Sequence, residues 1–455
     1  MTRSRRTRNN AGRRNTAIMA GGGLLLLGAL LYWGGTAQPG AAFWPGVAVA
    51  GGLVLGVGWL SWWLLLSPLP AGERVAANPT PPLRQAAAYV IAAGGVISLI
   101  GALWDAAWRQ MAGAADSGGF GWQPNLLIYG SVGLIAATAL GAALVAARGP
   151  GSLRARWRSD APLGLLGLLS LFALLVMAAG LLWPGVDATG VPAQDTSHVL
   201  LGVGMAAVML GAAAVQTSLL PQPAGWTVHR LGGGELNTVI LLAVAAAILL
   251  LAGAGAWGDP PDDALRPAWY YPAVILGVTL FIGQVGLHVL HRPGAAILIF
   301  AAVLFFRAIT NFLFQQFYGM TEAGATAEFL ALIPAAAMDV VYVYRTDEAG
   351  AMSTSWLAIG VGSAAMLAGG LWLLPRLVAY PPVDGATLPG LLIAGAGVGV
   401  FGGWCGARLG RAIAGVRRVP LPAAMQVRVA VIGAGAYIIL LVAAFFLMQS
   451  ASLPQ

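Results

Sequence analysis

The stretch LNTVILLAVAAAILLLAGAGAW, residues 236–257, decides the fold class, because it carries no charged side chain over its whole length. An uncharged apolar run of about 18 residues or more is the signature of a helix that spans a membrane. Similar runs recur along the chain, separated by short joins rich in proline and glycine. A transmembrane β-barrel would instead show strands of about ten residues with alternating apolar and polar side chains. The continuous runs therefore favour an all-α, polytopic transmembrane helix bundle.

The composition of the whole chain supports the same interpretation. Of its 455 residues, 58% are hydrophobic and only 9% are charged, whereas a soluble domain carries roughly 25% charged residues. The runs predict about thirteen transmembrane helices, at residues 16–36, 42–67, 84–107, 125–147, 161–183, 197–220, 236–257, 268–290, 294–317, 323–343, 352–375, 387–408 and 427–448. The chain has one cysteine, Cys405, which excludes an internal disulfide and cysteine-based metal centres.

The arginines are distributed unevenly between the two sides that these helices define. About twenty lie in the N-terminal tail and in alternate joins, and about three lie in the other joins. Cytoplasmic loops carry such an excess, so the N-terminus is expected inside and the C-terminus outside. We expect a basic cytoplasmic tail at 1–15, one transmembrane domain at 16–448 and a short outer tail at 449–455. Membrane topology also accounts for the net charge of +8, without a nucleic-acid partner.

Two helix pairs share a pattern that indicates a weak tandem repeat, at residues 84–147 and 161–220. In each pair a tryptophan stands at the exit of the first helix and an aspartate in a glycine-rich outer loop. A polar residue, Asn125 or His198, then opens the second helix. The alternative is chance similarity among helices that are rich in glycine and alanine.

The outer loop of the first pair carries aromatic, acidic and proline residues, namely Trp104, Asp105, Trp108, Asp116, Trp122, Pro124 and Tyr129. Their order resembles a pattern in a group of bacterial polytopic membrane proteins, close to W-D-x-x-W-H followed by an acidic residue and P-P-H-x-x-x-Y. The D-x3-H-x12-H spacing of that pattern is similar to the copper-ligand set in the membrane C subunit of particulate methane and ammonia monooxygenases. The resemblance covers roughly residues 95–205 and implies a bacterial cytoplasmic (inner) membrane protein.

Two departures from this pattern bear on metal binding. Arg109 replaces the first histidine and Asn125 the second. Arginine has no lone pair to offer a metal, and copper favours imidazole and thiolate ligands. We interpret the loop as a degenerate copper site, in which Arg109 pairs with Asp105, four residues before it on one helical face. The alternative is an interfacial belt of tryptophans with incidental loop charges.

The metal-ligand candidates that remain on the outer face are Asp105, Asp116, Asp195 and His198. Three are hard oxygen donors and only one is an imidazole, so we expect the protein to purify without stoichiometric copper. Copper is the only cofactor that the resemblance suggests. His198 and Asp195 have a second interpretation, as a capping cluster at a helix start.

Polar residues inside the predicted helices form two further candidate sites. Arg307, Asn311 and Gln315 are spaced four apart on one helical face, and Glu328 on the next helix is the expected partner of Arg307. This set is either the lining of a polar path or a buried ion pair that fixes helix register.

The second intramembrane site lies near the inner ends of two helices. Asp339 is expected to contact His288 or His291 there, either as a proton-carrying pair or as an interfacial pair.

The helix at 387–408 carries two rows of glycines spaced four apart. One row is Gly395, Gly399 and Gly403, and the other is Gly402, Gly406 and Gly410. Small residues in this spacing let neighbouring helices approach closely, so two close helix neighbours are expected.

Three functions remain open. The chain has no Walker A motif, no H-E-x-x-H and no nucleophile elbow. The leading hypothesis is a non-enzymatic accessory or scaffold protein, related to the copper-site family, whose partners are the lipid bilayer and other membrane subunits. The alternatives are a transporter or channel that uses the Arg307 face, and a membrane glycosyltransferase that uses the outer acids Asp262 and Asp263.

Overall fold

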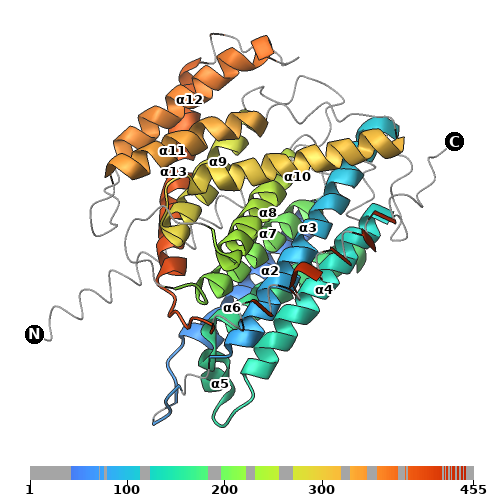
Figure 1. The fold of residues 1–455 in the computed structure, drawn as a ribbon, viewed down its shortest axis with the longest axis vertical. Coiled ribbons are helices and arrows are strands. Elements are labelled where there is room, and N and C mark those ends of the chain that lie inside the picture. The colour runs from blue at the N-terminus through green and yellow to red at the C-terminus, as the bar shows by residue number, and fades with distance from the viewer. Residues whose placement is uncertain are drawn as a thin grey trace, which may run out of the picture.

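The computed structural model is a bundle of helices, with no strand in the ranges that it describes (Figure 1). These ranges are residues 43–70, 72–75, 79–112, 123–182, 196–221, 231–255, 270–318, 328–345, 356–377, 385 and 388–422, with separate positions between 425 and 446. The helices are α2 (Phe43–Ser61), the π-helix η1 (Trp62–Leu66), α3 (Pro81–Ala112), α4 (Gln123–Ala146), α5 (Leu153–Ser159), α6 (Ala161–Leu182), α7 (Thr196–Thr217), α8 (Gly233–Gly255), α9 (Tyr270–Leu290), α10 (Ala295–Tyr318), α11 (Leu332–Arg345), α12 (Trp356–Leu377) and α13 (Leu388–Ala414). The predicted all-α class is therefore confirmed.

Eight helices of the described part are long and apolar enough to cross a membrane, namely α3, α4, α6, α7, α8, α9, α10 and α13. Two further apolar stretches are shorter, Gly51–Leu66 and Ile359–Leu373. The chain is thus a multi-pass helical membrane protein. The first predicted helix, 16–36, lies outside the described residues. The thirteen spans and the sides on which the two termini lie remain predictions.

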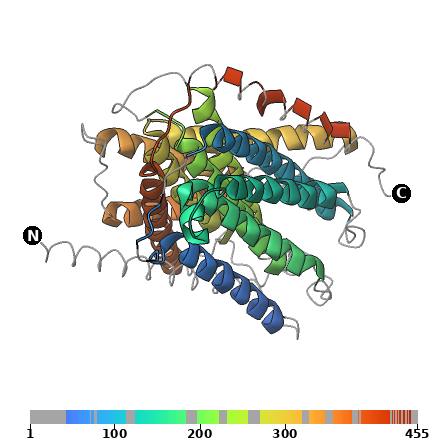
Figure 2. The ribbon, with the colours of Figure 1, turned by 90° about the horizontal axis from the view of Figure 1, so that it is seen from below.

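The centre of the bundle is built from α3, α7 and α8, with α9 beside them (Figure 1). Small side chains allow this close packing, because alanines at 243, 245 and 246 of α8 are fully buried. An added Cβ at Gly95 of α3 would lie 2.6 Å from the Met209 sulfur of α7. Figure 2 shows α2 at the rim of the bundle, where it packs on α6.

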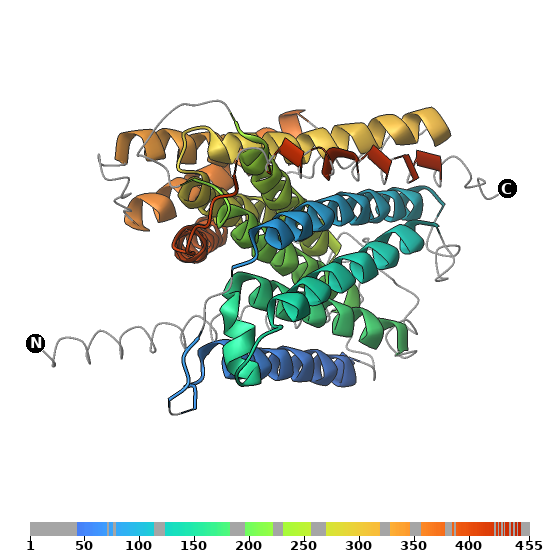
Figure 3. The same cartoon turned by 60° about the horizontal axis from the view of Figure 1, so that its bottom comes forward.

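The two predicted glycine rows of α13 do face two neighbours. On one side, an added Cβ at Gly402 would lie 2.9 Å from the Gly277 carbonyl oxygen of α9, and Gly406 presses on the Phe281 carbonyl of the same helix. On the other side, Gly395 and Gly399 pack against α12. Figure 3 shows α13 end-on while α3 and α4 are seen from the side, so α13 crosses their direction.

Helix ends that alternation assigns to one face of the membrane lie together in the structure. The start of α3, the start of α6 and the end of α7 meet, because Arg84 bonds Asp160 and Ser218. The end of α13 joins the same group, because the Val419 N–H donates to the Ser218 carbonyl. These helix ends thus lie together, while the alternation of the helices across the membrane and the assignment of this face to the cytoplasm remain predictions.

Two elements differ from the sequence-based expectation. In the described part of the span expected at 323–343, a 3₁₀ turn occupies 328–331 and α11 follows with 14 residues. About 20 residues are needed to cross the hydrocarbon layer, so α11 alone is too short. The second difference is α5, a short helix that the apolar runs did not indicate, since three of its seven residues are arginines.

Local contacts explain why α5 forms. Ser152 caps its first turn by accepting from the Ala155 N–H. The indole of Trp157 donates to the Gly164 carbonyl at 3.1 Å. Arg158 donates to the carbonyl of Leu64, in the last turn of the apolar α2–η1 segment, and to that of Ser67, directly after it. Cations are favourable at such carbonyl-rich helix ends, so α5 ties the α4–α6 connection to η1.

Candidate functional site

The structure contains the ion pair expected in the membrane interior. The Arg307 Nε of α10 lies 3.1 Å from the Glu328 Oε2, in the 3₁₀ turn before α11. Both side chains are buried, at 10% and 3% exposure. The Tyr271 hydroxyl of α9 donates to the other carboxylate oxygen at 3.0 Å. Three elements are therefore joined at one carboxylate.

A narrow crevice adjoins this pair. Apart from Arg307 and Glu328, its walls are the apolar side chains of Leu99, Leu103, Ala247, Leu251, Val303 and Phe306. It has room for about one water molecule. The crevice thus gives the ion pair a low-dielectric wall, and Leu99 and Leu103 place it toward the end of α3 that is remote from Arg84.

Asn311 and Gln315, the other two polar residues of the predicted α10 face, do not extend this site into the bundle interior. Asn311 is half-buried, and its Oδ1 is buried without a hydrogen-bond partner among the described residues. Gln315, one turn further along α10, is exposed. The face therefore runs from the bundle interior at Arg307 to the surface at Gln315.

A second buried ion pair, which sequence reasoning missed, lies at the opposite end of α3. The Arg84 Nη2 is 2.8 Å from the Asp160 Oδ1, with side-chain exposures of 5% and 0%. Asp160 also accepts from the Thr80 N–H at 3.1 Å and the Thr80 hydroxyl at 3.2 Å. It further caps α6 through the Leu163 N–H. Arg84 reaches on to the Ser218 hydroxyl at 2.9 Å.

Next to this pair, three buried amides form a hydrogen-bonded chain. The Asn237 amide of α8 donates to the Gln216 oxygen of α7 at 3.2 Å, and the Gln216 amide donates to the Gln85 oxygen of α3 at 3.4 Å. All three side chains are at most 5% exposed. We call the ion pair and this amide chain together the α3–α6–α7–α8 polar network.

Part of this network had a signal in the sequence. Asp160 stands directly before the apolar run at 161–183, which is the position of an N-cap. Arg84 is the first residue of the apolar run at 84–107, but in the sequence it served only as one of the arginines that predict which side of the membrane each loop faces. The pairing of the two has no local signature, because 76 residues separate them.

The residues of the predicted metal site are described only in part. Asp105 is half-buried on α3, Trp104 is fully buried and Asn125 is 8% exposed at the start of α4. Gly101 packs against Pro124 and Leu127, so the two helices approach closely at this end of the hairpin. Asp116, Asp195 and the side chains of Arg109 and His198 lie outside the described residues, and so do Asp262 and Asp263.

The described part of this region does not fit a copper ion. It offers one carboxylate, Asp105, and an amide, Asn125, where the related pattern has a second histidine. Copper prefers imidazole nitrogen and thiolate sulfur. In the described ranges as a whole, no group of three or more histidine, cysteine, aspartate or glutamate side chains comes together.

The expected contact of Asp339 with His288 or His291 is wrong. Its carboxylate accepts from the backbone N–H groups of Ala296 and Ile297, at 3.3 and 2.8 Å. These N–H groups open α10 and have no acceptor within the helix, and the positive end of the helix dipole favours a carboxylate there. Asp339 therefore caps α10 and ties α11 to it.

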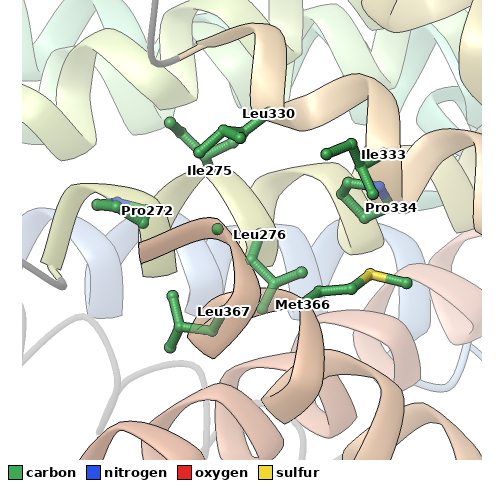
Figure 4. Close-up of a pocket in the computed structure, with 9 residues that line it drawn as sticks. Pro272, Ile275, Leu276, Leu330, Ile333, Pro334, Met366 and Leu367 are labelled. Atoms are coloured by element: carbon green, nitrogen blue, oxygen red, sulfur yellow. The ribbon is translucent and has the colours of Figure 1, made fainter. Parts of the chain in front are cut away.

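One further hollow lies between α9, α11 and α12 (Figure 4). Its walls are the apolar residues Pro272, Ile275, Leu276, Leu330, Ile333, Pro334, Met366 and Leu367, together with Gly370. Figure 4 shows their side chains around the gap between the three helices. The hollow offers no acid, base or polar side chain, so it contributes no chemistry to a site.

Comparison of the chain with protein-family models, with curated proteins and with solved structures finds no match.

Proposed function

We propose that the chain is a non-catalytic accessory or scaffold protein of the bacterial cytoplasmic membrane, which packs beside other membrane-protein subunits. The observation that carries the proposal is the saturation of the Asp160 carboxylate by Thr80, Arg84 and Leu163. A carboxylate has about four lone-pair positions. A substrate or metal at Asp160 would have to displace contacts that hold α3 and α6 together, so the network serves the architecture.

The second ion pair supports the same function. One carboxylate oxygen of Glu328 accepts from Arg307 of α10, and the other accepts from Tyr271 of α9. Charged groups at membrane depth are expensive unless they are paired, and a pair between helices specifies which helices adjoin. Both pairs thus act as ties within a bundle that presents a fixed surface to its neighbours.

The proposal includes a relationship to the copper-site family with its histidine ligands replaced. Its support is the close α3–α4 approach, which keeps Trp104 and Asn125 at one end of the hairpin. We expect the purified protein to contain less than stoichiometric copper by elemental analysis. The double variant Arg109→His/Asn125→His should bind copper more tightly than the unaltered chain. Stoichiometric copper in the unaltered protein would contradict the degenerate site.

Complementation of a strain that lacks the chain tests the scaffold function. At matched protein level, the double variant Arg307→Leu/Glu328→Leu should restore the deletion phenotype as fully as the unaltered chain, because two apolar residues can replace a structural pair. Gln315→Leu, which changes an exposed residue on the same face of α10, is the matched control and should also complement.

Transport is the second candidate, and the observation that favours it is the polar face from Arg307 through Asn311 to the exposed Gln315. A path through this face requires its polar lining. The double variant would then fold and fail to complement, and Gln315→Leu would be impaired too. That outcome replaces the scaffold proposal by a transporter or channel.

A further inference from the structure

The turn between α9 and α10 gathers positive charge at one end of the bundle. His291 follows the last residue of α9 and adopts φ 48°, in the left-handed region, while its N–H donates to the Leu287 carbonyl at 3.1 Å. Gly294 has φ 78° and α10 begins at the next residue. A non-glycine residue with positive φ is uncommon. This tight turn fixes the position of Arg292.

The end of α13 brings two more arginines to this turn. Gly410 packs on α9 so closely that an added Cβ would lie 2.9 Å from the His288 Cβ. The next residue, Arg411, is exposed and donates through its Nε to the Ala407 carbonyl of its own helix. Arg418 follows the end of α13 and donates to the Pro221 carbonyl. Burial lowers the pKa of His291, and the nearby Arg418 lowers it further.

Asp339, the acid expected to pair with these histidines, bonds the start of α10 instead. Asp339 accepts from the backbone N–H groups of Ala296 and Ile297 rather than from either histidine. The Arg292 Nη1 atom is buried and has no hydrogen-bond partner among the described residues. Arg292 as a whole is half-buried. The Nη1 donor has lost its water without gaining an acceptor among the described residues, which is costly.

We propose that the α9–α10 turn is a binding site for a phosphate-bearing anion, held by Arg292 with Arg411, Arg418 and His291 around it. Guanidinium groups present several N–H donors in a plane and bind phosphate oxygens with charge-assisted hydrogen bonds. A neutral His291 ring supplies one further N–H donor.

Two sources offer this chemistry, a phospholipid headgroup and free phosphate. The site follows directly on the apolar segments Tyr271–Leu290 and Ala295–Leu313, and therefore lies at a membrane boundary, where lipid phosphates are concentrated. If the arginine-rich face is cytoplasmic, as the sequence predicts, anionic lipids are also enriched there. A phospholipid and free phosphate can be told apart by adding each one separately.

The experiment measures thermal unfolding of the full-length protein in neutral detergent with phosphatidylglycerol, with phosphatidylcholine or with inorganic phosphate. The variants are Arg292→Gln, Arg418→Gln and, as a matched control, Arg148→Gln. Arg148 is exposed and follows α4, and the topology predicts it on the same face. Native mass spectrometry of the same samples gives the affinity for each lipid.

Phosphatidylglycerol should raise the unfolding temperature of the unaltered protein, and Arg292→Gln should weaken its binding about tenfold or more, since charge-assisted hydrogen bonds are lost. Arg148→Gln should bind as the unaltered chain does. An effect of inorganic phosphate alone, also lost in Arg292→Gln, supports the site with a soluble source. Arg418→Gln gives the same information if Arg292→Gln does not fold.

Two results would overturn the proposal. One is equal stabilisation by phosphatidylglycerol and phosphatidylcholine, with no effect of phosphate. The other is an anion effect that Arg148→Gln abolishes as fully as Arg292→Gln, since this would be a general attraction to a basic surface. Asp347 and Glu348, which follow α11 in the sequence, lie outside the described residues, and their neutral variants test whether they supply the counter-charge. If Asp347→Asn/Glu348→Gln is as unstable as Arg292→Gln, and anions have no effect, the protein neutralises Arg292 itself.

Discussion

The two buried ion pairs use the same chemistry but are set into the bundle differently. Arg84 and Asp160 belong to a network that also includes the Thr80 backbone, the α6 cap and the Ser218 hydroxyl. Glu328 bonds both Arg307 and the Tyr271 hydroxyl. Along α3 the two sites are about 25 Å apart, counted from Arg84 to Leu99 and Leu103 at 1.5 Å per residue.

This difference separates two ways of fixing helices in a membrane. The Arg307–Glu328 pair joins α10 to the turn before α11 by one charge contact, and the Tyr271 hydroxyl adds α9 as a third element. An apolar pair of similar size should hold α10 and the turn together nearly as well. The α3–α6–α7–α8 polar network joins four helices through buried polar groups, each of which needs a hydrogen-bond partner. If only some of these groups keep their partners, the bundle is less stable than it would be with apolar residues in their place. Substitutions at the two sites should therefore differ most in how far a double change rescues a single one.

The largest effect is expected for Asp160→Leu. This change leaves Arg84 buried without its carboxylate, removes the oxygen that accepts from both the N–H and the hydroxyl of Thr80, and uncaps α6. The loss should be about 4–5 kcal/mol or failure to accumulate, from the cost of an uncompensated buried charge and a lost cap. Thermal unfolding followed by circular dichroism in detergent measures it. Arg84→Met/Asp160→Leu should recover little, and full recovery would mean that the network is no more than a pair.

The next largest effect is expected for Arg307→Leu and Glu328→Leu singly. Each leaves one buried charge, which typically costs roughly 3–5 kcal/mol. The double variant should regain most of the loss, because replacing both partners of a buried ion pair leaves no uncompensated charge. Unfolding temperatures of the four proteins form a double-mutant cycle. If both single changes are silent, the two side chains are not partners in the folded protein.

A smaller effect is expected for Tyr271→Phe. The variant keeps the ring and removes one hydroxyl that donates to a buried carboxylate, at a cost of about 1–3 kcal/mol. In the background of Glu328→Leu the same change should have almost no further effect, since its acceptor is gone. Additive losses in that background would show that the hydroxyl serves some other group.

The smallest effect is expected at Glu73, a half-buried acid at the surface, which offers a contrast to both buried pairs. The side chain and backbone N–H of Ser152 donate to its carboxylate, and these bonds, with nearby Arg154, lower the pKa of Glu73. Because the pKa of Glu73 is lower in the folded protein than in the unfolded chain, its charge stabilises the fold at any pH above the ordinary pKa of a glutamate. This contribution disappears as the pH falls through the lowered pKa of the folded protein. The difference in unfolding temperature between the unaltered chain and Glu73→Gln should shrink from pH 7 to pH 3. A constant difference would mean that the carboxylate charge is irrelevant.

The sequence predicts those parts of the fold that depend on runs along one helix. The uncharged run at 236–257 corresponds to α8 at Gly233–Gly255, and the glycine spacing in α13 predicts two close neighbours. The contact between Arg307 and Glu328 follows from matching depths on adjacent helices. In these cases local periodicity or the length of a helix is enough to place the residue.

Contacts that depend on tertiary arrangement were missed or misassigned. Asp160 meets Arg84 only because α3 and α6 begin at the same end of the bundle. Asp339 was expected to contact a histidine, but it binds backbone N–H groups at the start of α10. Every helix start offers such N–H groups, so no residue type in the sequence marks them as the partner.

The scaffold proposal is tested most directly by the mass of the assembly that contains this chain in its native membrane. The membrane is extracted into lipid nanodiscs without detergent, and the particles are weighed by native mass spectrometry. The proposal predicts that the chain is found with at least one other polypeptide in a fixed ratio, and that Arg307→Leu/Glu328→Leu leaves this ratio unchanged. Particles that contain this chain and lipid alone would contradict it.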